Sequence, residues 1–269
     1  MNTRALKRFR AKLAADEPVY GMFVTLDAPN ITDMGVAIGL DWIVLDAEHG
    51  HLDWGDLMNH LRGAVRSDTV VLIRLTELSA GLVKRALDIG ADGFLIPCVE
   101  TAEQVEEAVS YAHYPPRGVR GLGGERATAW GQAAAIHVQD AEENVLVVPM
   151  FESLTGHANV NEIVAVDGVE MFYFGPSDFS ASAGFAGQWE GPGVAEKILE
   201  IKDAIRAAGK HCGLLSTSIE DLVQRRDQEF RMLGFGTDAS LLLRSLHDFL
   251  ASVGRDRKLR PSLDNDDTA

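Results

Sequence analysis

The sequence predicts an α/β protein folded as a (β/α)8, or TIM, barrel. Eight short apolar runs alternate with segments of helical periodicity along the 269 residues. The runs are rich in Val, Ile, Leu and Phe and lack strict alternation, a pattern typical of parallel strands covered on both faces. An open doubly wound sheet has the same alternation of elements. No Gly-x-Gly-x-x-Gly motif follows the first run, however, so the barrel is favoured.

The expected elements follow one another with short connections. In chain order the strands read VYGMFVTL (19–26), WIVLD (42–46), VVLIRL (70–75), GFLIPC (93–98), VLVVPMFE (145–152), VEMFYFG (169–175), KHCGLL (210–215) and FRMLGFG (230–236). Helical segments between them include 82–90, 102–113, 159–168 and 193–209. Several of these end in Gly, which commonly terminates a helix before the next strand.

Two segments depart from this rhythm. Residues 113–144 are too long for an ordinary connection and are expected to form a lid or an interface region. Residues 256–269 are polar and are expected to be a C-terminal tail that frays. The remainder, 1–255, is expected to be a single barrel domain, because barrels of 200–250 residues are common.

The charge and cysteine content of the chain limit the classes of binding partner and the compartment expected for it. The formal net charge of −15 disfavours nucleic acid, which is bound by neutralising phosphates with Lys and Arg, and it disfavours anionic membranes. The two cysteines, Cys98 and Cys212, make no disulfide framework and indicate a reducing compartment. We expect a cytoplasmic protein with no targeting segment and no membrane span.

Polar residues gather at the carboxyl ends of the expected strands, which form the active face of a TIM barrel. Asp46 ends the second strand and His49 follows it, Arg74 lies at the end of the third, Glu152 ends the fifth, and Asp178 follows the sixth. Each has a structural explanation as well: an acid can cap a helix, a histidine can lie in a loop, and an arginine can pair with a barrel acid. Their convergence on one face favours a catalytic site.

The residue types specify the chemistry. Glu152 and Asp178 supply two hard oxygen ligands with room for water and substrate, which suits Mg²⁺ or Mn²⁺. Backbone N–H groups of Ser177 and Asp178 would face a substrate anion at a helix start. Gly175 allows close approach of the backbone, and Pro176 sets the turn.

Around these residues the sequence resembles the HpcH/HpaI aldolase family, the metal-dependent class II pyruvate aldolases. The resemblance spans roughly residues 17–250 and rests on the order and spacing of several motifs. These are GLDWIVLDAEHG (39–50), LIRL (72–75), GADGFLIPCVET (90–101), YPPRGVRG (114–121), FES (151–153) and DGVEMFYFGPSDFSASAG (167–184).

The resemblance implies a TIM barrel that reversibly cleaves 4-hydroxy-2-oxo acids to pyruvate, or hydroxypyruvate, and an aldehyde through a metal-bound enolate. Glu152 and Asp178 would hold the divalent ion, Mg²⁺ or Mn²⁺ with Co²⁺ also compatible. Arg74 would donate to the keto oxygen. His49, oriented by Asp46, would act as the base.

The resemblance also implies a homo-oligomer, a hexamer built as a trimer of dimers. An N-terminal helix, the helices near residues 180–208 and a C-terminal helix would serve that assembly. The sequence departs from the family pattern at two positions near Glu152: Met150 replaces a Gln, and Ser153 replaces a Thr. The segment 120–131 also differs and carries Glu125, so aldehyde selectivity is expected to be set there.

Three rival functions remain open at this point. A lysine Schiff base is the mechanistic rival, although Lys210 opens a strand and so would lie on the opposite face of the barrel. A citryl- or malyl-CoA-type lyase would share the barrel and the metal pair, with Arg117, Arg120 and Arg126 as the only dense basic group for CoA phosphates. A non-catalytic binding protein is the third.

Overall fold

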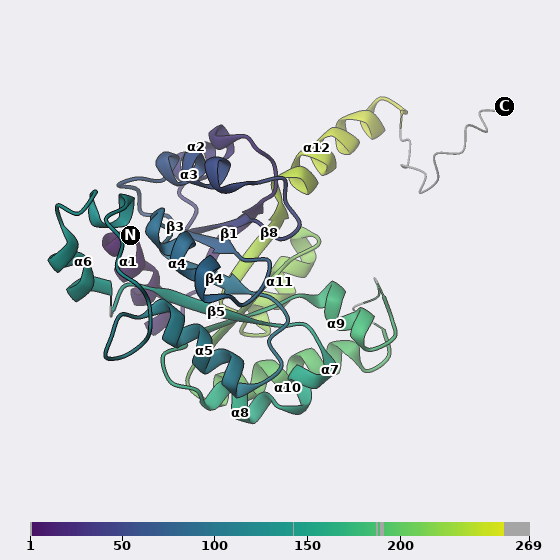
Figure 1. Ribbon diagram of the computed structural model, residues 1–269. Coiled ribbons are helices and arrows are strands. Elements are labelled where there is room, and N and C mark those ends of the chain that lie inside the picture. The colour runs from purple at the N-terminus through teal and green to yellow at the C-terminus, as the bar shows by residue number, and fades with distance from the viewer. Residues whose placement is uncertain (1, 142, 187, 189–190, 256–269) are drawn as a thin grey trace.

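Eight parallel strands form a closed barrel in which each strand pairs with the next and the last pairs with the first. The computed structural model describes residues 2–141, 143–186, 188 and 191–255, and Figure 1 shows the helices arranged around the strands. This architecture confirms the predicted TIM barrel. The tail expected over 256–269 lies outside the described residues.

All eight strands fall where the apolar runs place them. The strands are β1 (Val19–Val24), β2 (Trp42–Asp46), β3 (Val70–Arg74), β4 (Gly93–Ile96), β5 (Leu146–Phe151), β6 (Met171–Phe174), β7 (His211–Leu215) and β8 (Met232–Thr237). β2 has the predicted bounds, whereas β4 ends two residues before the predicted Cys98. The reason is local: Pro97 has no N–H to donate, and Cys98 has a φ of 53° that an extended strand does not allow.

Helices fill every connection. They are α1 (Thr3–Ala14), α2 (Pro29–Ala37), α3 (Trp54–Gly63), α4 (Ala80–Asp88), α5 (Ala102–Ala112), the 3₁₀ turn η1 (Arg126–Thr128), α6 (Ala134–Ala141), α7 (Leu154–Ala158), α8 (Val160–Ala165), α9 (Pro176–Ser182), α10 (Val194–Ala207), α11 (Ile219–Asp227) and α12 (Asp238–Ser252). Within the described part of the chain, none of these helices combines the length and hydropathy that crossing a membrane requires.

Strand residues alternate between the barrel interior and the helix layer. Val44 and Leu72 belong to the interior cluster, whereas Ile43 and Val71 pack in the layer beneath the helices. Because side chains alternate along a strand, Asp46 and Arg74 share the interior phase with Val44 and Leu72. The register of β2 on β3 places Asp46 directly opposite Arg74. Two polar residues at the strand ends therefore face the mouth together.

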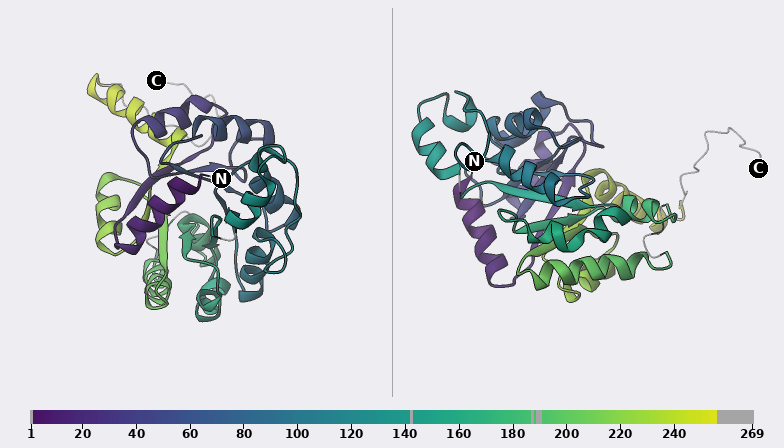
Figure 2. Two further views of the ribbon diagram at one scale, coloured as in Figure 1. Left: turned by 90° about the vertical axis from the view of Figure 1, so that its left-hand side faces the viewer. Right: turned by 60° about the horizontal axis from the view of Figure 1, so that its bottom comes forward.

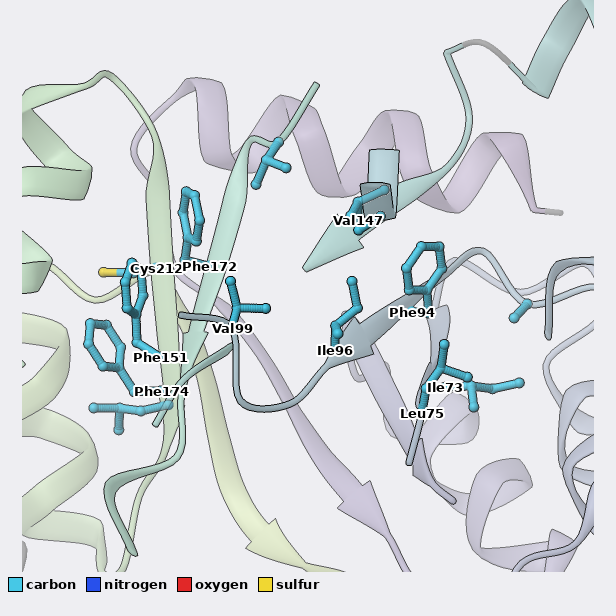
Figure 3. Close-up of a cluster of buried hydrophobic side chains, with 14 of the residues drawn as sticks. Ile73, Leu75, Phe94, Ile96, Val99, Val147, Phe151, Phe172, Phe174 and Cys212 are labelled. Atoms are coloured by element: carbon cyan, nitrogen blue, oxygen red, sulfur yellow. The ribbon is translucent and has the colours of Figure 1, made fainter. Parts of the chain in front are cut away.

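The outer layer is strongly apolar. Figure 3 shows Phe94 and Ile96 of β4 together with Phe151, Phe172 and Phe174 of β5 and β6. These side chains belong to one cluster, and each is at most 1% exposed. The ring centroids of Phe151 and Phe172 are 5.5 Å apart. Burial on this face explains why the strands lack the alternation of a half-exposed sheet.

Helix α1 closes the amino-terminal end of the barrel. Its apolar residues Leu6, Phe9 and Leu13 are at most 3% exposed and belong to the same cluster as the barrel interior. The left view of Figure 2 shows this helix crossing the end of the barrel. Its apolar face is thus used within the chain, and a part for α1 in assembly remains a prediction.

The segment 113–144 lies at the closed end of the barrel rather than over the mouth. It follows α5 and leads into the amino end of β5, and Arg126 within it donates to the carbonyl oxygen of Ile89 over 2.7 Å. In Figure 1, α6 lies beside the N-terminus, far from α9. A lid over this chain's own mouth is therefore the wrong expectation, and so is a role for Glu125 in this chain's own aldehyde pocket.

A buried polar group anchors this segment. The guanidinium of Arg120 donates to Asp88 over 2.9 Å and lies 4.8 Å from the ring centroid of Tyr114. The His137 ring packs against Tyr114 with centroids 6.0 Å apart. Burial, reinforced by the positive charge of Arg120, lowers the pKa of His137 to about 4. The folded protein therefore holds His137 neutral.

Acidification is expected to destabilise the protein through His137. The unfolded chain binds this proton below about pH 6.5, whereas the folded chain binds it only near pH 4. Between these values the unfolded state carries more protons, so the free energy of unfolding falls as the pH falls. Urea denaturation at about pH 7 and about pH 5 should show a smaller loss of stability on acidification for His137→Leu than for the unsubstituted protein. Parallel losses would contradict the assignment.

Helix α12 extends away from the barrel (Figure 1). Its apolar side chains are exposed: Leu242 by 56%, Leu246 by 48% and Phe249 by 71%. A single chain rarely leaves a row of large apolar residues in water. The helix therefore presents a surface suited to the predicted assembly.

Candidate active site

A cavity of about 720 Å³ opens at the carboxyl ends of the strands. Residues from six strands, the loops that follow strands and the first two turns of α12 line it. They are Phe23, His49, Arg74, Met150, Glu152, Tyr173, Phe174, Gly175, Pro176, Ser177, Asp178, Leu215, Ser216, Thr217, Gly236, Thr237, Ser240 and Arg244. Every site residue predicted from the sequence except Asp46 lines this cavity, and Asp46 contacts Arg74.

Arg74 is held by two acids. Its Nε donates to Asp46 Oδ1 over 2.9 Å, and its Nη2 donates to Asp46 Oδ2. Its Nη1 forms an ion pair with Glu48 Oε2 at 3.1 Å. Burial opposes the charge, but the hydrogen bonds and charge of Asp46, with Glu48, outweigh it and raise the pKa of Arg74. The guanidinium is a permanently charged, rigidly oriented donor at the mouth.

Asp46 and His49 are related differently from the prediction. The Asp46 carboxylate accepts from the backbone N–H groups of Glu48 at 3.1 Å and His49 at 3.2 Å, so it orders the loop rather than the imidazole. The His49 Nε2 lies 4.0 Å from Glu48 Oε2, and its side chain is 65% exposed. Asp46 thus positions Arg74 and the backbone beside His49, while Glu48 is the acid near the ring.

Glu152 is a buried acid of the cavity, and the charges of Asp178 and Glu48 act on it. Glu152 is 4% exposed, and its Oε2 accepts from the backbone N–H of Cys98 over 2.6 Å. Burial raises the pKa of Glu152 despite that hydrogen bond, and the negative charges of Asp178 and Glu48 raise it further. Burial likewise raises the pKa of Glu48. Glu48 was not singled out from the sequence, although it stands between Asp46 and His49.

This charge distribution fits a cation. Glu152 and Asp178 line the cavity, and the charge of Glu48 also acts on Glu152, while the nearby guanidinium is already engaged by Asp46 and Glu48. Carboxylates in such surroundings are stabilised by a divalent ion, which takes oxygen ligands and retains open positions for other ligands. Within the described residues no three His, Cys, Asp or Glu side chains form a ready-made ligand cluster. Glu152 and Asp178 therefore suit an ion that keeps places for water or substrate.

Asp178 is placed by the start of α9. The N-cap of that helix is Gly175, and Asp178 lies in the first turn with no side-chain capping bond. The capping explanation for Asp178 is thus not what the structure shows. Its exposed carboxylate lines the cavity beside Ser177. The end of β6 and the start of α9 thus bring Asp178 to the cavity that Glu152 also lines.

Gly175 makes room for the buried acid. A Cβ atom on Gly175 would lie 2.2 Å from Oε1 of Glu152. The backbone φ of −102° is one that alanine also adopts, so a side chain would act by displacing the Glu152 carboxylate.

Gly175→Ala is accordingly expected to lower kcat/KM roughly 100-fold, the cost of misplacing a catalytic group by about 1 Å. Steady-state kinetics together with Mn²⁺ titration check this. Gly124→Ala is the matched control, because a Cβ at Gly124 meets nothing within 4 Å. Unchanged Mn²⁺ affinity in Gly175→Ala would refute the role of this contact.

The opposite wall holds polar groups that the sequence analysis did not identify. Ser216 follows β7, and its hydroxyl is buried with no hydrogen-bond partner among the described residues. Arg244 comes from α12, half-buried at the cavity edge. Neither carries a local signal, because a lone Ser after a strand and an Arg two turns into a helix are ordinary surface residues.

The residues that a Schiff-base mechanism or a CoA site would use lie outside this cavity. No lysine is among the residues that line the cavity, and Lys210 Nζ donates to the carbonyl oxygen of Val166 at the amino end of β7. Arg120 has a side chain that is 0% exposed and is paired with Asp88. Arg126 donates to the carbonyl oxygen of Ile89, away from the mouth. None of the three arginines proposed for CoA phosphates, Arg117, Arg120 and Arg126, is among the described residues that line this cavity.

The fold accommodates both residues near Glu152 that differ from the family pattern, Met150 and Ser153. Met150 is 2% exposed and lines the cavity, on the same face of β5 as Glu152. Ser153 caps α7 by accepting from the Gly156 N–H over 3.1 Å and donates to Glu100 over 2.6 Å. Met150 thus makes the cavity floor apolar where an amide would make it polar, whereas Ser153 serves the local fold.

Comparisons with known proteins agree with this geometry. The sequence model of the family described as HpcH/HpaI aldolase/citrate lyase matches residues 19–245. A hydroxypyruvate/pyruvate aldolase from Delftia acidovorans is 36% identical over 251 residues, which are 93% of this chain and 92% of that protein. A 4-hydroxy-2-oxovalerate aldolase from Rhodococcus jostii is 34% identical over 222 residues, covering 82% of this chain and 85% of that protein.

A solved structure shows the same fold. The crystal structure of an HpcH/HpaI aldolase/citrate lyase family protein from Burkholderia cenocepacia superimposes with a TM-score of 0.88 at 32% sequence identity. The alignment covers 94% of this chain and all of that chain. The range matched by the family model, 19–245, contains every strand of the barrel and every residue that lines the cavity.

Proposed function

The chain belongs to the HpcH/HpaI aldolase/citrate lyase family, and from that premise we propose that this pyruvate-type aldolase, a carbon–carbon lyase, is divalent-metal-dependent and cleaves 4-hydroxy-2-oxo acids reversibly. The products are pyruvate, or hydroxypyruvate, and an aldehyde. One observation carries the proposal: the buried Glu152, its pKa raised, lines with Asp178 the cavity that Arg74 also lines.

The residues account for each charge that the reaction develops. In the cleavage direction the C3–C4 bond breaks, its electron pair forms the enolate of the oxo acid, and the proton of the C4 hydroxyl leaves as the aldehyde forms. Negative charge then grows on the former keto oxygen. Arg74, fixed by Asp46, places a guanidinium donor in the cavity, where it stabilises that charge without reorganisation.

His49 is the proposed proton acceptor. It lines the cavity and is largely exposed, so it can exchange its proton with water between turnovers. Glu48 Oε2 lies 4.0 Å from His49 Nε2. His49 takes the proton of the C4 hydroxyl directly or through a water molecule.

Glu152 and Asp178 would hold Mg²⁺ or Mn²⁺, with Co²⁺ also compatible. A divalent ion there supplies Lewis-acid polarisation of the keto group and charge neutralisation for the carboxylate of the oxo acid. Ser177 and the backbone at Gly175 and Pro176 form the adjoining wall and bound the place for that carboxylate.

Deuterium exchange at the methyl group of pyruvate tests the proposal most directly. The protein stripped of metal should show no exchange, and restoring Mg²⁺ or Mn²⁺ should bring it back. Borohydride treatment with pyruvate should leave no covalent adduct, because none of the described residues that line the cavity is a lysine. A trapped adduct, or exchange that ignores metal, would overturn the mechanism. Equal cleavage of CoA esters and free oxo acids would favour the CoA-lyase alternative.

The aldolase is further proposed to be a homo-oligomer, a hexamer arranged as a trimer of dimers. The exposed Leu242, Leu246 and Phe249 of α12 support this. Leu246→Asp with Phe249→Asp should reduce the mass measured by light scattering. Unchanged mass would remove α12 from the interface.

A further inference from the structure

We infer that the wall of the cavity formed by the ends of β7 and β8 and the start of α12 is a subsite for an acidic group, carboxylate or phosphate, on the aldehyde half of the substrate. Arg244 is its cation and Ser216 its hydroxyl. The inference rests on the proposed function and specifies which aldehydes the enzyme prefers.

Arg244 is the second cation of the cavity. The other, Arg74, is engaged by Asp46 and Glu48. Arg244 instead donates to two main-chain carbonyl oxygens, that of Thr217 over 2.8 Å and that of Phe235. Carbonyl oxygens orient a guanidinium but leave its charge uncompensated, and no ion pair within the described part of the chain includes Arg244. Five N–H donors are available on a guanidinium, so several remain for a ligand.

The backbone is shaped around this guanidinium. Gly236 has a φ of 119°, and a Cβ there would lie 2.9 Å from Arg244 Nη2 and 2.7 Å from Ser240 Oγ. Only glycine takes this conformation readily. The missing side chain lets the guanidinium lie against the end of β8 and face the cavity that Gly236 also lines.

Ser216 provides the independent observation. The residue is 4% exposed, lines the same cavity, and its Oγ has no hydrogen-bond partner within the described residues. Its backbone N–H is already used, donating to the carbonyl oxygen of Gly234 over 2.8 Å. A buried hydroxyl without a partner is unfavourable, so one that faces a cavity marks a place where a ligand atom accepts its proton.

The acid on this wall is turned away from the subsite. Asp238 accepts from the backbone N–H and hydroxyl of Thr25 and from the Leu26 N–H, at 2.8–3.2 Å. Its charge is therefore satisfied toward β1. The loops after β7 and β8 are also where TIM barrels most often bind anionic groups. The wall thus combines an uncompensated cation with an unpartnered hydroxyl.

The position of the wall identifies the part of the substrate that it meets. The oxo-acid carboxylate and keto group belong at the Glu152 and Arg74 side. A cavity of about 720 Å³ exceeds what pyruvate fills. The far end of an extended 4-hydroxy-2-oxo acid, which becomes the aldehyde, is the group that reaches Arg244. Arg244 is accordingly a specificity residue rather than a catalytic one.

The test compares aldehydes in the aldol direction with pyruvate and the metal-loaded enzyme. Succinic semialdehyde, a phosphorylated aldehyde and the neutral butanal are the three acceptors. We expect kcat/KM for an acidic acceptor to exceed that for butanal by about tenfold or more. Arg244→Gln should reduce that ratio by roughly 10- to 100-fold, Ser216→Ala should reduce it less, and Arg244→Lys should restore part of it.

The outcomes separate the two proposals. Arg62→Gln, an exposed arginine of α3 that does not line the cavity, should keep the ratio of the unsubstituted enzyme. If pyruvate exchanges deuterium but the ratio is near one, or stays unchanged in both Arg244→Gln and Ser216→Ala, the subsite is refuted while the aldolase proposal stands. Absence of exchange would refute the aldolase itself. The stronger of the two acidic acceptors identifies carboxylate or phosphate.

Discussion

Glu152→Gln is expected to lower kcat on the order of 1,000-fold, because it removes one of the two carboxylates proposed to bind the divalent ion. The change is nearly isosteric, and the amide oxygen still accepts from the Cys98 N–H that Glu152 now binds at 2.6 Å. Steady-state cleavage of a 4-hydroxy-2-oxo acid and Mn²⁺ titration by calorimetry should both show the loss.

The stability of the Glu152→Gln protein shows whether Glu152 is a metal ligand or an acid that stabilises the fold. Burial raises the pKa of Glu152, and Asp178 and Glu48 add repulsion, so the carboxylate opposes folding when no metal is bound. Glu152→Gln should therefore leave the metal-free protein at least as stable to heat as the parent. Glu162→Gln, an exposed acid of α8, is the control for charge alone. Full activity in Glu152→Gln would refute the metal site.

Arg74→Lys should reduce kcat by roughly 100- to 1,000-fold, the usual cost of losing a donor aimed at a developing oxyanion. Lysine keeps the charge but not the planar fork that contacts both oxygens of Asp46. The lost geometry, rather than lost charge, is the expected cause. Deuterium exchange at pyruvate, which forms the same enolate, should fall in parallel with cleavage.

The matched control for Arg74→Lys is Arg62→Lys on α3, outside the cavity. A mutant that loses aldol cleavage but keeps pyruvate exchange would show that Arg74 acts on the aldehyde half instead. Asp46→Asn should resemble Arg74→Lys in kinetics, because Asp46 works by holding Arg74. If a high substrate concentration restored the cleavage rate of Arg74→Lys, Arg74 would contribute to substrate binding alone.

The strand ends show how far local pattern leads. Asp46, Arg74 and Glu152 are predicted at the mouth because each lies at or next to the end of an apolar run, and all three have the interior phase of their strand. Period-two alternation and a common strand direction suffice to place them at one mouth. The end of β4 was missed by two residues, since an apolar Pro–Cys pair continues the composition of the strand but not its hydrogen bonds.

The segment 113–144 shows where local pattern fails. Its length and its Pro, Gly and Arg content mark it as unusual, yet nothing in those residues says which end of the barrel it covers. Its buried anchor, Arg120 with Asp88 and Tyr114, joins positions far apart in the chain. The role of the apolar face of α1 could not be predicted for the same reason. Covering the end of a barrel and binding a partner subunit both require a row of apolar residues along one side of the helix.

The sequence alone determined the barrel, the order of its elements and the membership of Arg74, Glu152 and Asp178 in one mouth, since periodicity and chain direction are local properties. Only the tertiary structure decided which side chains contact one another in the site. It paired Asp46 with Arg74, added Glu48, and brought Ser216 and Arg244 to the opposite wall. Hydrogen bonds and buried charges depend on which distant segments pack together, and that is settled by the fold as a whole.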